Sequence, residues 1–123
     1  MAKRILHVDD DPIFLDLVRA TFAGDPEVQI RSIRNAEDAL TVLPDFKPDL
    51  IIADIALPNI GGFEFILRLR EAPQTTTVPV IVLSGRARNL GSQNPFHQMA
   101  VVVLEKPVGP DMLRHEAMRL LSA

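Results

Sequence analysis

Two uninterrupted aliphatic runs, residues 80–83 and 101–104, constrain the fold of this chain more than any other feature of the sequence. A strand with one face in water alternates apolar and polar residues, and these runs have no polar face. Such runs are typical of strands in a parallel sheet that helices cover on both sides. Five short apolar segments recur along the chain, most of them rich in Val and Ile and bounded by turn-forming residues: 5–8, 28–33, 50–53, 78–83 and 100–104.

Helical patterns alternate with these predicted strands. Asp11 and Asn35 stand where N-cap residues would begin two helices, and Pro44 predicts the end of the second. Apolar residues at helical spacing follow in four segments: 14–21, 36–43, 65–69 and 113–121. Phe63 and Phe65 cannot both face the core of one helix, so one of them is expected to be exposed. Strands that alternate with helices predict right-handed crossovers and a doubly wound α/β domain.

Residues 86–98 fit this pattern least well. They should hold the fourth helix, yet they contain Gly91 and the pair Asn94-Pro95. A proline inside a helix costs about 3 kcal/mol, and the residue before it is pushed out of the helical region. We therefore expect a fourth helix that is short, displaced or broken.

Composition limits the classes of protein that the chain can belong to. Its 123 residues fit one domain, so residues 1–123 are expected to form a single unit. The net charge of −3 argues against direct nucleic-acid binding, and the absence of cysteine excludes disulfides and thiolate metal sites. Without a signal-peptide pattern or an apolar run of about 20 residues, we expect a cytoplasmic protein that does not insert into a membrane.

Polar residues end four of the five predicted strands. Asp9 and Asp10 follow the first strand, Asp54 the third and Ser84 the fourth, and Lys106 follows the fifth. Ligands of open parallel sheets bind at this carboxyl edge, where the winding direction switches. Carboxylates held close together repel, and Mg²⁺ relieves the repulsion while leaving positions for a phosphoryl oxygen. An aspartate can also act as a nucleophile toward phosphorus, so the edge predicts phosphoryl transfer. His7, inside the first strand, is expected to be a satisfied, partly buried residue rather than a ligand.

These residues resemble the receiver domains of bacterial two-component response regulators. Four segments carry the resemblance over essentially the whole chain: the first strand with its acidic pair (5–12), the segment around Asp54 (48–62), the strand ending in Ser84 (79–84) and the pair Lys106-Pro107. The resemblance implies a flavodoxin-like sheet of five parallel strands in the order 2-1-3-4-5. It also implies a cis peptide bond between Lys106 and Pro107.

The resemblance also implies a role for each site residue. Asp54 would accept a phosphoryl group from a histidine kinase or a histidine phosphotransfer protein, and a downstream effector domain or protein would receive the signal. Asp10 and Asp54 would bind Mg²⁺, Asp9 would act mainly through a water, and the backbone carbonyl of Ala56 would complete the protein ligands. Two further residues contact the phosphoryl group in this scheme, the first by a hydrogen bond and the second by its charge: Ser84 and Lys106.

The sequence departs from the family at the region used for output. Val103 stands where the family usually has an aromatic residue that swings inward, and a β-branched side chain has few rotamers. Arg86 lies at a position that tunes the lifetime of the phosphoryl group. The alternative is therefore a pseudo-receiver that binds partners without phosphorylation. An aspartyl-phosphate enzyme is disfavoured because Ala56 replaces the acid/base Asp of such enzymes, so no turnover of an external substrate is expected.

Overall fold

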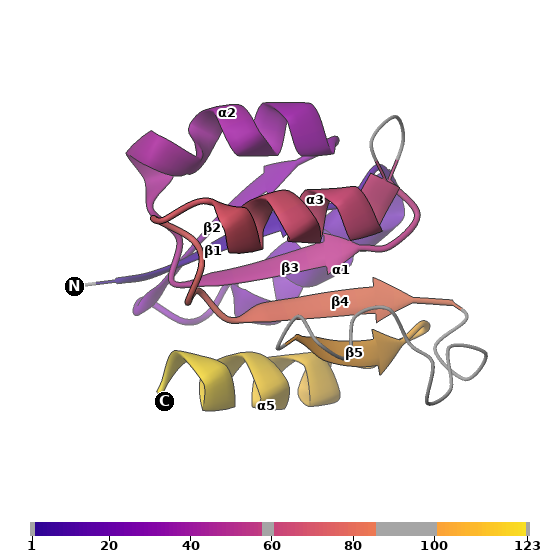
Figure 1. Ribbon diagram of the computed structural model, residues 1–123. Coiled ribbons are helices and arrows are strands. Elements are labelled where there is room, and N and C mark those ends of the chain that lie inside the picture. The colour runs from indigo at the N-terminus through magenta and orange to yellow at the C-terminus, as the bar shows by residue number, and fades with distance from the viewer. Residues whose placement is uncertain (1, 58–60, 86–100, 123) are drawn as a thin grey trace.

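The computed structural model describes residues 2–57, 61–85 and 101–122, which form a sheet of five parallel strands with helices on both faces (Figure 1). The strands are β1 (Lys3–Val8), β2 (Val28–Ile33), β3 (Leu50–Asp54), β4 (Val80–Ser84) and β5 (Val102–Glu105). Their spatial order is β2-β1-β3-β4-β5, so the chain winds first to one side of β1 and then to the other. This order confirms the predicted doubly wound α/β fold and places the topological switch between β1 and β3.

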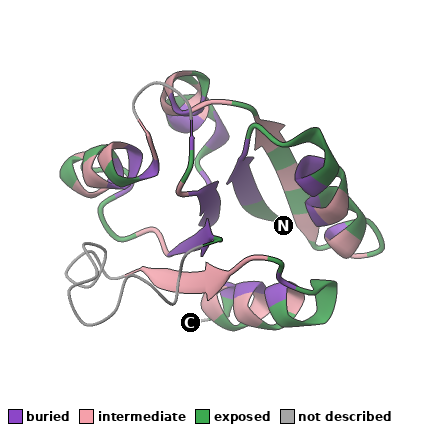
Figure 2. Cartoon of the chain, turned by 90° about the vertical axis from the view of Figure 1, so that its right-hand side faces the viewer, coloured by how far each residue is buried: buried purple, intermediate pink, exposed green. Residues whose placement is uncertain are grey.

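Within the described residues, two helices cover each face of the sheet. α2 (Ala36–Phe46) and α3 (Gly61–Glu71) pack on one face, and α1 (Pro12–Phe22) and α5 (Pro110–Leu121) pack on the other. Figure 2 shows the buried sides of these helices turned toward the sheet and their exposed sides turned outward. Across the described part of the chain, no helix has the length and apolarity that crossing a bilayer requires. The predicted irregular fourth helix lies outside the described residues.

Burial along the strands follows the aliphatic runs except at one edge. Every residue of β3 and β4 is buried, as continuous apolar runs in central strands predict. β5 is only half-buried along its length, and it begins at Val102 rather than two residues earlier. Among the strands that the structure describes, it is the last in the sheet order and pairs only with β4. The run at 101–104 therefore predicted a strand correctly but overstated its burial.

The second helix continues beyond the proline that was expected to end it. α2 runs through Pro44 to Phe46 and ends at Lys47, a residue with a φ of 52° whose N–H donates to the carbonyl of Leu43. Phe46 is buried against the α2–α3 face of the sheet. Burying a phenylalanine stabilises by about 1.5–3 kcal/mol, which is comparable to the cost of about 3 kcal/mol for an internal proline. The prediction that Pro44 ends the helix was wrong because burial of Phe46 offsets that cost.

The start of α3 lies against the chain that leaves β3. A Cβ atom added to Gly62 would lie 2.5 Å from the Cα of Ile55, closer than any real side chain can come. The N–H of Gly62 donates to the carbonyl of Ile55 at 3.0 Å. Glycine at this position thus lets the helix dock directly behind Asp54. Further along α3, Phe65 is fully buried and Phe63 is 41% exposed, which confirms that only one of the two faces the core.

Candidate functional site

The carboxyl ends of the strands bring the predicted polar residues to one edge of the sheet. Asp9 directly follows β1, Asp54 is the last residue of β3, and Asp10 extends the first loop. A carboxylate oxygen from each of these three residues lies within 4.8 Å of the other two. Asp9 is fully buried, Asp54 is nearly so, and Asp10 is exposed. The cluster thus has a closed side within the protein and an open side toward solvent.

Lys106 bridges the two buried carboxylates. Its Nζ donates to Oδ2 of Asp9 at 3.2 Å and to Oδ2 of Asp54 at 3.1 Å. The same ammonium lies 4.4 Å from the ring centre of Phe14 in α1, so it also has an aromatic face beneath it. The backbone holds this geometry as well, because the N–H of Lys106 donates to the carbonyl of Ser84 at 2.8 Å. The peptide bond from Lys106 to Pro107 is cis, as the resemblance implied.

Burial and charge shift the ionisation of this pair in a consistent way. Burial disfavours the carboxylate and raises the pKa of Asp9, and the neighbouring charge of Asp54 adds to that effect. Burial works against the ammonium of Lys106, but its hydrogen bond with Asp54 and the charges of both carboxylates outweigh it and raise the pKa of Lys106. The single positive charge of Lys106 therefore balances only part of the negative charge of the three carboxylates.

Backbone groups support the two buried aspartates on their other oxygens. Oδ1 of Asp9 accepts from the N–H of Asp11 at 2.9 Å, and Oδ1 of Asp54 accepts from the N–H of Ala56 at 3.1 Å. These bonds fix each carboxylate so that one oxygen faces the loop and the other faces Lys106. Ser84 is fully buried at the end of β4, beside the same edge of the sheet.

The donor chemistry of the cluster suits a hard divalent cation. Carboxylate oxygens are the ligands that Mg²⁺ takes in proteins, together with waters and phosphate oxygens. Three carboxylates gathered within 4.8 Å match that preference, and one ammonium, that of Lys106, pairs with two of them. The residues present therefore fit the metal that the sequence predicted.

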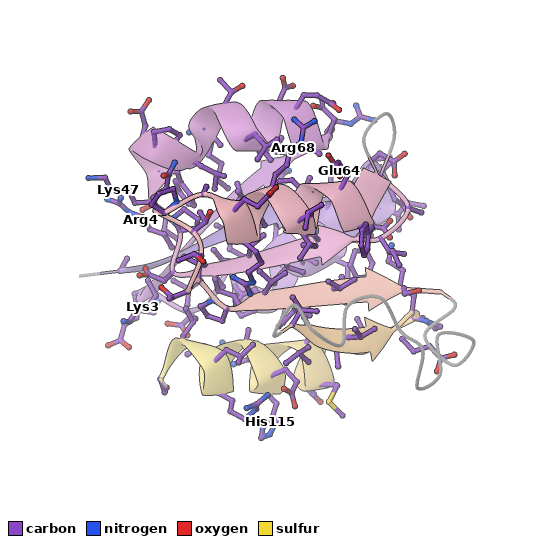
Figure 3. The ribbon with its side chains drawn as sticks, viewed as in Figure 1. Lys3, Arg4, Lys47, Glu64, Arg68 and His115 are labelled. Carbon is purple, nitrogen blue, oxygen red and sulfur yellow. The ribbon has the colours of Figure 1, made fainter. Side chains whose placement is uncertain are left out.

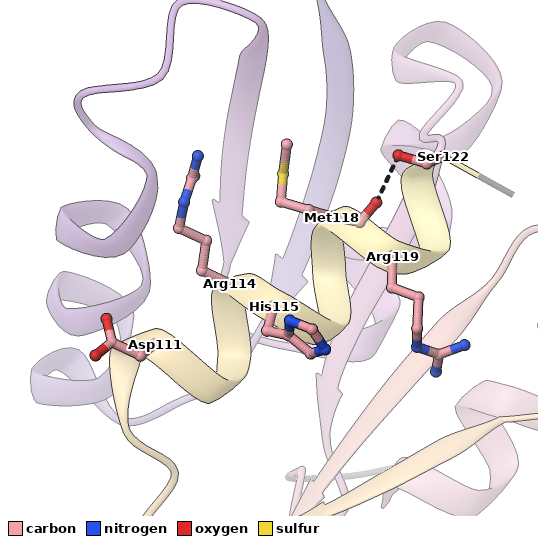
Figure 4. Close-up of a pocket in the computed structure, with 6 residues that line it drawn as sticks. All are labelled: Asp111, Arg114, His115, Met118, Arg119 and Ser122. Atoms are coloured by element: carbon pink, nitrogen blue, oxygen red, sulfur yellow. Dashed lines mark hydrogen bonds between the residues drawn. The ribbon is translucent and has the colours of Figure 1, made fainter.

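A separate hollow on α5 has no carboxylate of this cluster in its lining, which consists of Asp111, Arg114, His115, Met118, Arg119 and Ser122 (Figure 4).

His7 differs from its sequence-based prediction. It is fully buried rather than partly buried, and neither ring nitrogen has a hydrogen-bond partner among the described residues. Its Nε2 lies 3.9 Å from Oδ2 of Asp9, beyond hydrogen-bonding distance, and its ring meets the ring of Phe14 edge-on at 5.8 Å. Burial, with the charge of Lys106 next in size, lowers the pKa of His7 to about 3. No sequence pattern predicts this environment, because a buried histidine usually has a hydrogen-bond partner.

The output positions are only partly described. Val103 pairs with Val82 in the sheet and packs against the cluster formed with α2 and α3. It is half-buried and offers no ring in the place where the family usually has one. Arg86 lies outside the described residues.

The fold and the acidic edge define the class: a doubly wound α/β domain with an acidic cluster at its topological switch. The chain belongs to the response regulator receiver domain family, whose family model matches residues 5–118. Receiver domains of this family act in two-component signalling.

Three similar proteins illustrate the relationship. An uncharacterized 14.6 kDa protein in the sodA1 3′ region of Leptolyngbya boryana is 40% identical over 86% of this chain and 80% of its own length. The response regulator Rre1 of Synechocystis is 29% identical over 96% of this chain, which spans about half (51%) of that regulator. The crystal structure of a putative response regulator from Chloroflexus aurantiacus is 26% identical, with a TM-score of 0.89 and full coverage of both chains (100%).

Proposed function

We propose that this chain is a phosphoryl-accepting receiver domain of a two-component phosphorelay, in which Asp54 takes a phosphoryl group from a phosphohistidine donor. The observation that supports this most directly is the position of Asp54. Its Oδ2 lies 3.1 Å from the ammonium of Lys106 and beside two further carboxylates, at the end of a buried strand. A phosphoryl donor can reach Asp54 from the open side of the cluster, and the ammonium of Lys106 is in position to pair with the negative charge of the phosphoryl group.

In the proposed transfer, a carboxylate oxygen of Asp54 attacks phosphorus. An O–P bond forms while the P–N bond to the donor imidazole breaks, and the imidazole nitrogen keeps the electron pair and takes up a proton. Lys106 pairs with the phosphoryl oxygens, and the hydroxyl of Ser84 donates a hydrogen bond to one of them. When bound, Mg²⁺ would supply positive charge that favours the transfer, and it would be held by Asp9, Asp10, Asp54 and the carbonyl of Ala56.

The partners follow from this chemistry. The donor is a histidine kinase or a histidine phosphotransfer protein, and the signal passes to a downstream effector domain or protein. We also propose that residues 1–123 form one receiver domain, which the match over 5–118 and the single five-stranded sheet support. Ala56 offers no carboxylate to activate water, so turnover of an external substrate forms no part of the proposal.

Replacing the phosphoacceptor tests the proposal. With [³²P]acetyl phosphate and Mg²⁺, the protein should become labelled at Asp54, and Asp54→Asn should reduce the label to background. Asp49→Asn is the matched control, because Asp49 lies at the opposite end of β3 and accepts a hydrogen bond from the N–H of Arg4. Undiminished labelling of Asp54→Asn, measured on the intact protein by gel and by mass, would contradict the assignment.

The second candidate is a pseudo-receiver that binds its partner without phosphorylation. Val103 favours it, since this half-buried aliphatic residue has no large surface to relocate. The two candidates differ in how the amide NMR spectrum responds to Mg²⁺ and beryllofluoride, a mimic of the phosphoryl group. A response at Asp10, Asp54, Ser84 and Lys106 that vanishes in Asp54→Asn supports the receiver, and no response supports the pseudo-receiver.

A further inference from the structure

A buried histidine beside the acidic cluster has no part in the transfer just described. His7 is fully buried in β1, between Ser32 of β2 and Ile52 of β3 in the sheet register. Both of its ring nitrogens are without a hydrogen-bond partner in the described part of the chain. An aliphatic residue at this position would avoid the cost of burying two polar atoms. A buried polar group without a partner in a native protein calls for a functional explanation.

The nearest polar neighbour of the ring is an oxygen that already has a partner. Oδ2 of Asp9 accepts from Nζ of Lys106 at 3.2 Å, and Nε2 of His7 lies 3.9 Å from the same oxygen. Phe14 lies against both donors, with its ring 4.4 Å from the ammonium and 5.8 Å from the imidazole. Two nitrogens are thus held within 4 Å of one buried carboxylate oxygen, and only one of them is hydrogen-bonded to it.

The proposed transfer would change this arrangement. When Asp54 carries a phosphoryl group, Lys106 pairs with the phosphoryl oxygens, and the buried Oδ2 of Asp9 loses its charged donor. A buried carboxylate oxygen without a donor is strongly disfavoured. A movement of about 1 Å would bring Nε2 of His7 from its present distance into hydrogen-bonding range of that oxygen.

We propose that His7 is a positioning residue that donates an Nε2–H hydrogen bond to Oδ2 of Asp9 once Lys106 has turned to the phosphoryl group. Asp9 then keeps its orientation within the acidic cluster. This role rests on the proposed function, and it acts through Asp9 rather than on the phosphoryl group. The neutral ring suits the task because it carries one N–H and adds no positive charge beside Lys106.

Three forms of the protein test the proposal: wild type, His7→Leu and His7→Gln. Leucine fills the buried space without a donor, and the glutamine amide keeps an N–H at the end of a side chain of similar reach. Binding of beryllofluoride with Mg²⁺, followed by NMR titration, should weaken about tenfold in His7→Leu and be largely restored in His7→Gln. The urea stability of His7→Leu without ligand should equal or exceed that of wild type, because the unpartnered polar atoms are gone.

The ¹⁵N-labelled imidazole of wild type provides a second readout. Its Nε2–H resonance should move downfield when Mg²⁺ and beryllofluoride bind, as expected for a new hydrogen bond to a carboxylate. Wild-type binding with an unmoved His7 resonance, or unchanged affinity in His7→Leu, would overturn the role of His7 and leave the proposed function standing. If wild type itself bound no beryllofluoride, the proposed function would fail and the role of His7 with it.

Discussion

The two ends of the sheet treat polar groups in opposite ways. At the amino end, the loop after α3 satisfies the groups it buries. Pro73 has no N–H for the carbonyl of Leu69, and the buried hydroxyl of Thr75 donates to that carbonyl at 2.6 Å instead. Arg70 closes the same loop by donating to the carbonyls of Thr75, Thr76 and Val78.

At the carboxyl end, one lysine donates hydrogen bonds to two carboxylates, and one histidine has no hydrogen-bond partner in the described part of the chain. Asp9 and Asp54 share the ammonium of Lys106, and His7 waits beside them without a hydrogen bond among the described residues. This contrast identifies the carboxyl end as the part of the fold that ligand binding can stabilise. At the amino end the buried groups described above already have hydrogen-bond partners, so a ligand would add little stability there. At the carboxyl end the excess negative charge means that a bound cation or hydrogen-bond donor would stabilise the fold.

Removal of the bridging lysine should have the largest effect on stability. Lys106→Met leaves the buried Asp9 and Asp54 without their cation, and we expect a loss of about 3 kcal/mol in the free energy of unfolding. Millimolar Mg²⁺ should recover much of this loss, because the metal pairs with the same carboxylates. Urea unfolding with and without Mg²⁺ measures both effects.

The control for this variant is Lys3→Met, since Lys3 is exposed at the start of β1 (Figure 3). It should change the stability by less than about 0.5 kcal/mol, with no dependence on Mg²⁺. A Lys106→Met protein as stable as wild type would show that the carboxylates do not depend on this bridge.

A substitution at the amino end of the sheet should cause a smaller loss of stability, and this loss should not depend on metal. Thr75→Val keeps the shape of the side chain but removes the donor to Leu69, and we expect a loss of about 1–2 kcal/mol. Capture of beryllofluoride should be unchanged. Thr76→Val is the matched control, because its hydroxyl bonds the carbonyl of Arg70 in an exposed place where water can replace it. Equal losses in the two variants would argue against the importance of burial.

The weakest of these effects should be the pH dependence of stability that comes from Asp25 in the turn after α1. The N–H of Glu27, followed by the guanidinium of Arg114, holds the pKa of Asp25 below its usual value of 3.8. A carboxyl whose pKa is lowered by folding stabilises the protein above the unfolded pKa, and this contribution is lost as the pH falls through the folded pKa. Asp25→Asn should therefore be less stable than wild type at pH 7, and the difference should shrink as the pH falls below 3.8.

Arg114→Met sharpens this last prediction. It removes one of the two favourable partners of Asp25 and leaves the hydrogen bond from the N–H of Glu27, so its loss at pH 7 should be smaller than that of Asp25→Asn. Urea unfolding at several pH values would compare the two variants, and a larger loss in Arg114→Met would contradict this order.

Much of the fold could be predicted from the sequence, because aliphatic runs and cap residues act locally. The strand runs at 50–53 and 80–83 predicted fully buried strands, and the positions of Asp9, Asp54 and Lys106 at strand ends predicted that they would meet. The strand order came from the resemblance to a known family and not from the pattern itself.

The failures have physical reasons that a linear pattern does not contain. Pro44 was expected to end α2, but the tertiary burial of Phe46 decided the outcome. The missing partners of His7 depend on distances between strands and loops that are far apart in the sequence. The same holds for the position of the Lys106 ammonium over the ring of Phe14.

The ring beneath the ammonium also makes the protein convenient to observe. The sequence contains no Trp or Tyr and only 6 Phe, so fluorine-labelled phenylalanine would give a short and well-separated spectrum. The Phe14 ring touches the one ammonium that the proposed transfer would displace, and its electrostatic surroundings follow that ammonium. A single resonance from α1 would thus record the occupancy of the aspartate in real time, in a crude mixture and without any added chromophore.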